Sequence, residues 1–138
     1  MTSNTTYHIF RKPLEANQLP LLVTGCAGVP GYNAFHYFLS HYPGQVVGIR
    51  STVTWRLQHP QIYAIDIEDE PAMTELFKKY RFNSILDCSG SCALKSCELN
   101  PHHAELINVA GLHSLLKARA LYAPHSRLIR LSCDLVYS

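Results

Sequence analysis

Long hydrophobic runs are missing from the sequence, in which no apolar stretch reaches the roughly 20 residues of a membrane-spanning helix. The first residues, 1–4, are polar, so we expect no signal peptide. Charge is also scarce: charged residues make up 16% of the 138 residues and the net charge is +2. The lysines and arginines form no basic run. We therefore expect neither a membrane nor a nucleic acid as partner. The 47% hydrophobic content suffices for one domain with a buried core.

Cysteine is limited to five residues, an odd number, and no Cys-x-x-Cys pair occurs. Without a secretory signal, this favours reduced thiols in a cytoplasmic protein. Five potential metal ligands crowd one region: Cys88, Cys92, Cys97, His102 and His103. Their spacing does not suit a tetrahedral zinc site, so we expect no metal. Cys26 adjoins a predicted helix start, whose dipole can lower a thiol pKa. It is therefore either a redox-active thiol or simply a small residue in a tight turn.

Short apolar runs alternate with helical segments after residue 19. Strands are predicted over 21–23, 45–49, 62–65, 84–88 and 127–131, and helices over 31–41, 70–80 and 100–122. This alternation is typical of an α/β domain whose parallel sheet has helices on both faces. Right-handed crossovers then give a doubly wound, three-layer α/β/α fold with strand order 3-2-1-4-5. Residues 1–19 form an N-terminal extension to this domain, which covers 20–138.

The predicted helices differ in how they begin and in what they bury. Helix 70–80 has Pro71 in its first turn, and helix 100–122 starts with Asn100 as N-cap followed by Pro101. Helix 31–41 is apolar and aromatic on nearly all sides, so we expect it to be buried. Its predicted core residues are Tyr32, Phe35, Tyr37 and Phe38.

The segment after the first strand carries three glycines at intervals of three residues. Gly25 permits the tight turn, Gly28 lets the backbone approach a pyrophosphate, and Gly31 allows close packing of helix on strand. Because the turn follows a strand and opens a helix, it is typical of a Rossmann-type dinucleotide-binding fold; a tight turn without ligand is the alternative. The predicted cofactor contacts here are Gly25, Cys26, Ala27, Gly28, Val29, Pro30 and Gly31.

The end of the second strand indicates which cofactor is bound. An acidic residue there would bind the ribose 2′-hydroxyl of NAD, but the strand ends in Gly48-Ile49-Arg50. Arg50 instead suits the 2′-phosphate of NADP, with a solvated arginine as the alternative. Arg56, in the same loop, is a second candidate for that phosphate. We therefore expect NADP as the cofactor, and NAD as the alternative.

Further motifs, together with the glycine turn, carry a family resemblance that covers about residues 21–138. With Asp66-Ile67, Cys88-Ser89-Gly90 and Cys133-Asp-Leu-Val-Tyr137 in place, the chain resembles the extended short-chain dehydrogenase/reductase (NAD-dependent epimerase/dehydratase) family. The run Cys97-Glu-Leu-Asn-Pro, followed by Ala104 and Asn108, makes it most similar to the dTDP-4-dehydrorhamnose reductase branch.

The resemblance implies roles for further residues. Asp66 would lie near the adenine amino group, with a plain turn residue as the alternative, and the backbone of Ile67 would hold the ring. The loop after the fourth strand would cover the cofactor's ribose and pyrophosphate. These additional cofactor contacts are Asp66, Ile67, Cys88, Ser89, Gly90 and Ser132.

The sequence departs from the family where the chemistry is expected. The family transfers hydride with the help of a Tyr-x-x-x-Lys pair and a Ser or Thr after the fifth strand. Here Cys133 occupies the Ser/Thr position, and a thiol is a poor hydrogen-bond donor. Ser132, one residue earlier, points to the opposite face if the strand continues. No Tyr-x-x-x-Lys occurs in the sequence, and its end just after the fifth strand favours a fragment over a natural short form.

Two functions follow from these observations. The resemblance implies the cofactor-binding part of a sugar-nucleotide oxidoreductase, whose full-length form transfers hydride between NADP(H) and a keto-sugar nucleotide. The 138-residue chain alone would then catalyse nothing. The alternative is a non-catalytic regulatory or partner-binding subunit of the same fold, which Cys133 would suit. We also expect a homo-oligomer, because the fifth strand leaves an exposed sheet edge.

Overall fold

A computed structural model describes residues 12–91 and 94–132 of the protein. Its centre is a parallel sheet of five strands in the order β3-β2-β1-β4-β5, which confirms the predicted topology. The strands are β1 (Leu21–Val23), β2 (Val46–Arg50), β3 (Ile62–Ala64), β4 (Ser84–Asp87) and β5 (Arg127–Arg130). Each strand begins and ends within one residue of its predicted bounds, because turn residues delimit each short run clearly.

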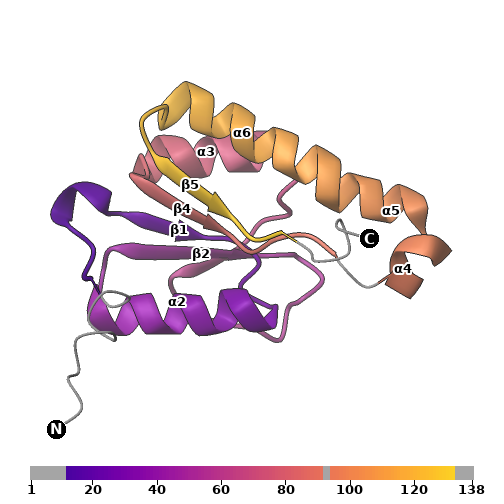
Figure 1. The fold of residues 1–138 in the computed structure, drawn as a ribbon, viewed down its shortest axis with the longest axis horizontal. Coiled ribbons are helices and arrows are strands. Elements are labelled where there is room, and N and C mark those ends of the chain that lie inside the picture. Colours follow the sequence, from indigo (N-terminus) through magenta and orange to yellow (C-terminus); the bar gives the residue numbers. More distant parts are fainter. Residues whose placement is uncertain (1–11, 92–93, 133–138) are drawn as a thin grey trace, which may run out of the picture.

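Helices cover both faces of the sheet, as Figure 1 shows. One face carries α2 (Val29–His41), and the other carries α3 (Glu70–Tyr80) and α6 (Gly111–Tyr122). Side chains alternate accordingly: Leu21 packs with Phe35 on the α2 side, whereas Leu22 packs with Phe77 on the opposite side. The remaining helical segments are η1 (Ala16–Gln18), α4 (Leu94–Leu99), α5 (Pro101–Glu105) and the π-helical turn η2 (Leu106–Ala110).

The predicted helix over 100–122 is not a single α-helix. It begins as predicted, since Asn100 Oδ1 accepts a hydrogen bond from the backbone N–H of His103 at 3.1 Å. It then consists of α5, the π-helical turn η2 and α6. A π-helical turn inserts one residue without breaking the helix, so apolar spacing in the sequence does not reveal it.

The prediction that the aromatic residues of α2 belong to the core is wrong for two of them. Phe35 is fully buried, and Phe38 packs partly buried against the same cluster. Tyr32 and Tyr37, however, are 46% and 51% exposed. The helix contacts the sheet along one side only, so its opposite side faces solvent whatever residues it carries.

The described part of the N-terminal extension packs against the domain. The backbone N–H of Leu14 donates to Tyr42 Oη at 2.6 Å, and Leu19 is buried in the cluster on the α2 side. Residues 1–11 lie outside the described part. At the far edge of the sheet, β5 leaves Ile129 nearly half exposed, and the self-association expected from this edge stays a prediction. Within the ranges 12–91 and 94–132, no helix combines the length and apolarity needed to cross a membrane.

Candidate functional site

The glycine turn connects β1 to α2 at the carboxyl edge of the sheet. Gly25 has φ +65°, and a Cβ at this position would collide with the carbonyl group of Cys88. A Cβ on Gly31 would collide with the carbonyl group of Gly25, so the first turn of α2 lies directly on the glycine turn. Gly28 is the N-cap of α2 and provides no side-chain hydrogen bond to the helix. The backbone N–H groups of Val29 and Gly31 in the first turn of α2 are therefore available to an anion, whereas Pro30 between them has none.

A cavity of about 340 Å³ lies beside this turn, where the strands end. Nine of the predicted cofactor contacts line it: Gly25, Ala27, Gly28, Arg50, Asp66, Ile67, Cys88, Ser89 and Gly90. Four other predicted contacts, Cys26, Val29, Pro30 and Gly31, belong to the turn but do not line the cavity, and neither does Ser132. The lining also includes residues that were not predicted as cofactor contacts: Ile49, Ser51, Val53, Thr54, Ile65, Glu68, His103 and Ile107.

Asp66 joins the loop after β3 to the loop after β2. Its carboxylate accepts hydrogen bonds from Ser51 Oγ at 2.8 Å, from the Thr52 N–H at 2.9 Å and from Thr52 Oγ1 at 2.8 Å. Burial raises the pKa of Asp66, but the hydrogen bonds from Thr52 and Ser51 outweigh it, so the net pKa lies below the usual value. In the sequence, this contact is indicated only by the two adjacent hydroxyl residues, Ser51 and Thr52, directly after β2.

Arg50 ends β2 as a buried cation. The residue is 7% exposed, and its Nη1 donates to the backbone carbonyl of Ser51 at 3.0 Å. Its Nε is buried without a hydrogen-bond partner, and Arg50 forms no ion pair with any residue in the described part of the chain. A buried guanidinium without an anionic partner is unfavourable, so this side chain suits an anion supplied by a ligand. The predicted alternative of a solvated arginine is wrong.

Arg56 occupies a different surface from Arg50. Its guanidinium lies 5.4 Å from the centroid of the Trp55 ring, and both residues line a second cavity next to the first. The two cavities share Ala27, Val53 and Thr54. Arg50 and Arg56, both predicted as candidates to bind the 2′-phosphate, therefore line different cavities.

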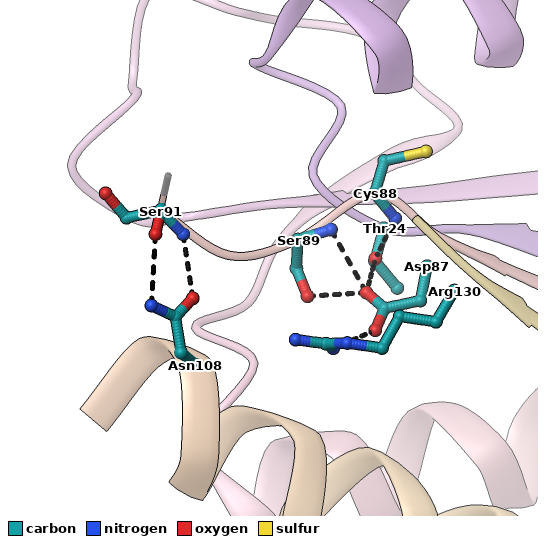
Figure 2. Close-up of polar contacts among 7 residues, drawn as sticks. All are labelled: Thr24, Asp87, Cys88, Ser89, Ser91, Asn108 and Arg130. Carbon is teal, nitrogen blue, oxygen red and sulfur yellow. Dashed lines mark hydrogen bonds and ion pairs between the residues drawn. The ribbon is translucent and has the colours of Figure 1, made fainter. Parts of the chain in front are cut away.

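The carboxyl end of β4 carries a fully buried carboxylate, Asp87. Its Oδ1 accepts hydrogen bonds from Thr24 Oγ1 at 2.6 Å and from the Ser89 N–H at 3.0 Å, as well as from Ser89 Oγ. Its Oδ2 accepts a hydrogen bond from Arg130 Nη1 on the neighbouring strand β5 (Figure 2). One carboxylate thus connects the ends of β1, β4 and β5.

Asn108, in the π-helical turn, holds the next part of the same loop. Its Oδ1 accepts from the Ser91 N–H at 2.8 Å, and its Nδ2 donates to the Ser91 carbonyl at 3.1 Å (Figure 2). A Cβ on Gly90 would lie 2.9 Å from Asn108 Oδ1, so this position accommodates little besides glycine. The loop 88–91 is therefore fixed at both ends, by Asp87 and by Asn108.

Of the two interpretations of Cys26, the redox-active thiol does not fit the structure. Its side chain is fully buried, and its Sγ donates to the carbonyl of Val23 at 3.3 Å. Burial raises the pKa of the Cys26 thiol to about 12. The sulfur lies in the apolar cluster between α2 and the sheet, and this desolvation is the largest effect on the thiol pKa despite the nearby helix start. Cys26 is therefore a packing residue.

In the folded chain, iodoacetamide at pH 8 should leave Cys26 unmodified while it alkylates the partly exposed Cys97. With a pKa of about 12, only about one Cys26 thiol in ten thousand is ionised at this pH, and the thiolate is the reactive form. Peptide mass spectrometry measures both residues in one sample. Alkylation of Cys26 in urea provides the control, and rapid modification of Cys26 in the native chain would contradict this assignment.

The other predicted site residues have limited structural support. Ser132 is exposed beyond the end of β5. Cys133 lies outside the described residues, as does Cys92 of the five potential metal ligands. Among the residues that the structure describes, no three His, Cys, Asp or Glu side chains are close enough to hold a metal ion.

The strand order, the glycine turn and the cavity at the strand ends define a Rossmann-type α/β fold. Residues 21–138 match the model of the NAD-dependent epimerase/dehydratase family, and the chain belongs to this family. This confirms the resemblance inferred from the sequence. No curated protein matches the sequence significantly.

Several solved structures share this fold at low sequence identity. UDP-glucose 4-epimerase from Stenotrophomonas maltophila, with bound NAD and formylated UDP-arabinopyranose, is 24% identical with a TM-score of 0.71 over 87% of this chain. The UDP-Glc/GlcNAc 4-epimerase from Campylobacter jejuni is 17% identical with a TM-score of 0.72 over 86% of this chain. A hypothetical dTDP-4-dehydrorhamnose reductase from Sulfolobus tokodaii is 21% identical with a TM-score of 0.66 over 81% of this chain. In each case this chain spans 38% of the other protein.

Proposed function

We propose that the chain is the NADP-binding domain of a sugar-nucleotide oxidoreductase similar to dTDP-4-dehydrorhamnose reductase. In the full-length protein, hydride would pass between NADP(H) and a keto-sugar nucleotide. The observation that carries the proposal is the cavity between the glycine turn, Asp66 and the buried Arg50, which forms no ion pair within the described part of the chain. The epimerase with bound NAD and the dehydrorhamnose reductase among the similar structures support the substrate class.

The residues around the cavity fit a dinucleotide. The uncapped N–H groups at the start of α2 suit a pyrophosphate, and Gly28 leaves open space for it, since a Cβ there would contact only the Gly25 carbonyl, at 3.4 Å. Arg50 Nε is a buried donor with no acceptor among residues 12–91 and 94–132, and a 2′-phosphate would supply an acceptor to this side chain. Asp66 and Ile67 line the part of the cavity next to β3, where adenine is expected.

These residues would bind and orient the cofactor. When bound, a nicotinamide cofactor supplies hydride-transfer chemistry. The loop 88–91, fixed by Asp87 and Asn108, would cover the ribose next to the pyrophosphate. Because the sequence contains no Tyr-x-x-x-Lys pair, we expect no proton transfer and no turnover by this chain alone.

A second candidate function is a non-catalytic regulatory or partner-binding subunit. It is favoured by Cys133, a weak hydrogen-bond donor where the family places Ser or Thr. The coding sequence after Ser138 distinguishes the two functions. A Tyr-x-x-x-Lys pair in that sequence supports the enzyme, whereas a stop codon or a substituted pair supports the subunit.

The cofactor proposal is tested by titrating the chain with NADPH and NADH in a calorimeter. We expect NADPH to bind at least about tenfold more tightly, since a charge-assisted hydrogen bond contributes about 1.5–3 kcal/mol. Arg50→Met should abolish this preference by weakening NADPH binding and leaving NADH binding nearly unchanged.

Arg127→Met is the matched control, because it removes the same charge at the opposite edge of the sheet, where β5 begins. It should leave both affinities unchanged. Equal affinity of the unsubstituted chain for NADPH and NADH would refute the role of Arg50, and no binding of either would refute the cofactor proposal. A preference that is lost in Arg56→Met, and kept in Arg50→Met, would place the phosphate in the second cavity.

A further inference from the structure

Asp87 and Arg130 form an ion pair that sheet packing alone does not require, between a fully buried carboxylate and a guanidinium that is 28% exposed. Strand β4 begins with Ser84, Ile85 and Leu86, and an apolar residue after them would extend the core on the α6 side. Instead, the chain buries a carboxylate completely, although removing an ionised group from water costs several kcal/mol. Its cost is offset by hydrogen bonds to Thr24 and Ser89 and by the charge of Arg130.

The pair lies at the carboxyl ends of β4 and β5, whereas Arg50 and Asp66 lie at the ends of β2 and β3. Asp87 and Arg130 face each other in the register of β4 and β5. Arg50 is the last residue of β2 and Asp66 follows β3, and both strands lie on the other side of β1. In a doubly wound sheet, a dinucleotide lies across the switch point, with one nucleotide over each half. If the adenosine lies over β2 and β3, the nicotinamide half lies over β4 and β5.

We propose that Arg130 is a positioning residue for the nicotinamide half of the cofactor. It acts through Asp87, whose hydrogen bonds hold the start of the loop 88–91 against the glycine turn (Figure 2). The contact is close, since the Cys88 N–H also donates to Thr24 Oγ1 at 3.1 Å. Arg130 also neutralises the carboxylate, which would otherwise place an uncompensated negative charge beneath this half of the site. The inference rests on the proposed function.

The test compares two ligands that occupy different parts of the site. NADPH spans both halves, whereas 2′-AMP contains only the adenosine half with its 2′-phosphate. We expect Arg130→Gln to weaken NADPH binding by about tenfold or more, and 2′-AMP binding by less than about twofold. Arg130→Lys, which keeps the charge, should retain most of the NADPH affinity. In Asp87→Asn/Arg130→Gln, where neither group is charged, the affinity should recover to within about threefold of that of the unsubstituted chain.

Lys117→Gln is the matched control, since it removes an exposed ion pair with Glu70, 2.7 Å long, from the surface of α6. It should change neither affinity. An equal loss of 2′-AMP and NADPH affinity in Arg130→Gln would show a merely structural role and overturn the inference, as would no loss of either. If Arg130→Gln does not fold, the test uses Arg130→Lys and Asp87→Asn/Arg130→Gln instead. Loss of NADPH affinity in both of these variants would contradict the inference. Failure of the unsubstituted chain to bind NADPH or 2′-AMP would refute the proposed function itself, and the inference with it.

Discussion

Gly25→Ala should lower the free energy of unfolding by about 2–5 kcal/mol and abolish NADPH binding. Two effects add. The φ of +65° is the left-handed conformation, which costs roughly 1–2 kcal/mol for a residue with a Cβ. The new Cβ would also collide with the backbone of Cys88, and overpacking of this kind costs roughly 1–3 kcal/mol. Because a backbone atom cannot rotate away, the glycine turn and the loop 88–91 must separate, which opens the proposed pyrophosphate site.

Gly44→Ala separates these two effects. Gly44 also has a positive φ, of +78°, but a Cβ there would meet nothing within 4 Å. It should cost only the roughly 1–2 kcal/mol of the left-handed conformation and leave NADPH binding unchanged. Urea denaturation of the two variants measures the difference in the free energy of unfolding, and calorimetry measures the affinities. Equal destabilisation by Gly25→Ala and Gly44→Ala would show that the contact with Cys88 contributes nothing.

The glycine turn was predictable because its signals are local. A strand, three glycines and a helix start follow one another within about ten residues, and each glycine position has its own steric requirement. The strand order was predictable for a related reason, since the alternation of short strands and helices leaves few topologies. Arg50 was also found this way, because it is the last residue of an apolar strand.

The network around Asp87 could not be predicted in the same way. Asp87 and Arg130 are 43 residues apart, and their contact depends on the register between β4 and β5. In the sequence, Asp87 is only a polar residue at the end of a strand. Similarly, the contact between Asn108 and Ser91 depends on a π-helical turn, which differs from an α-helix by a single inserted residue. Cys26 shows the same limit, since its position beside a helix start did not specify which way the thiol points.

Phe35→Ala should cost about 3–5 kcal/mol of unfolding free energy, the range for removing a large aromatic side chain from a core. Phe35 is fully buried between α2 and the sheet, in the cluster that contains Val23 and Val46. Its ring also packs edge-on against His59, with centroids 5.2 Å apart. Truncation would leave a cavity lined by β1 and β2, and residues in the middle of a sheet cannot move far to fill it.

Tyr37→Ala tests the corrected assignment of α2, because it removes an aromatic ring from the same helix. Tyr37 is 51% exposed and contacts the rings of Phe38 and His41 at the helix surface. Its loss should cost less than about 1 kcal/mol, as expected for a surface position. A large cost for both variants in urea denaturation would mean that the outer side of α2 is covered in solution, by a second copy of the chain or another surface. A dependence of the Tyr37→Ala effect on protein concentration would then identify a second copy as the covering surface.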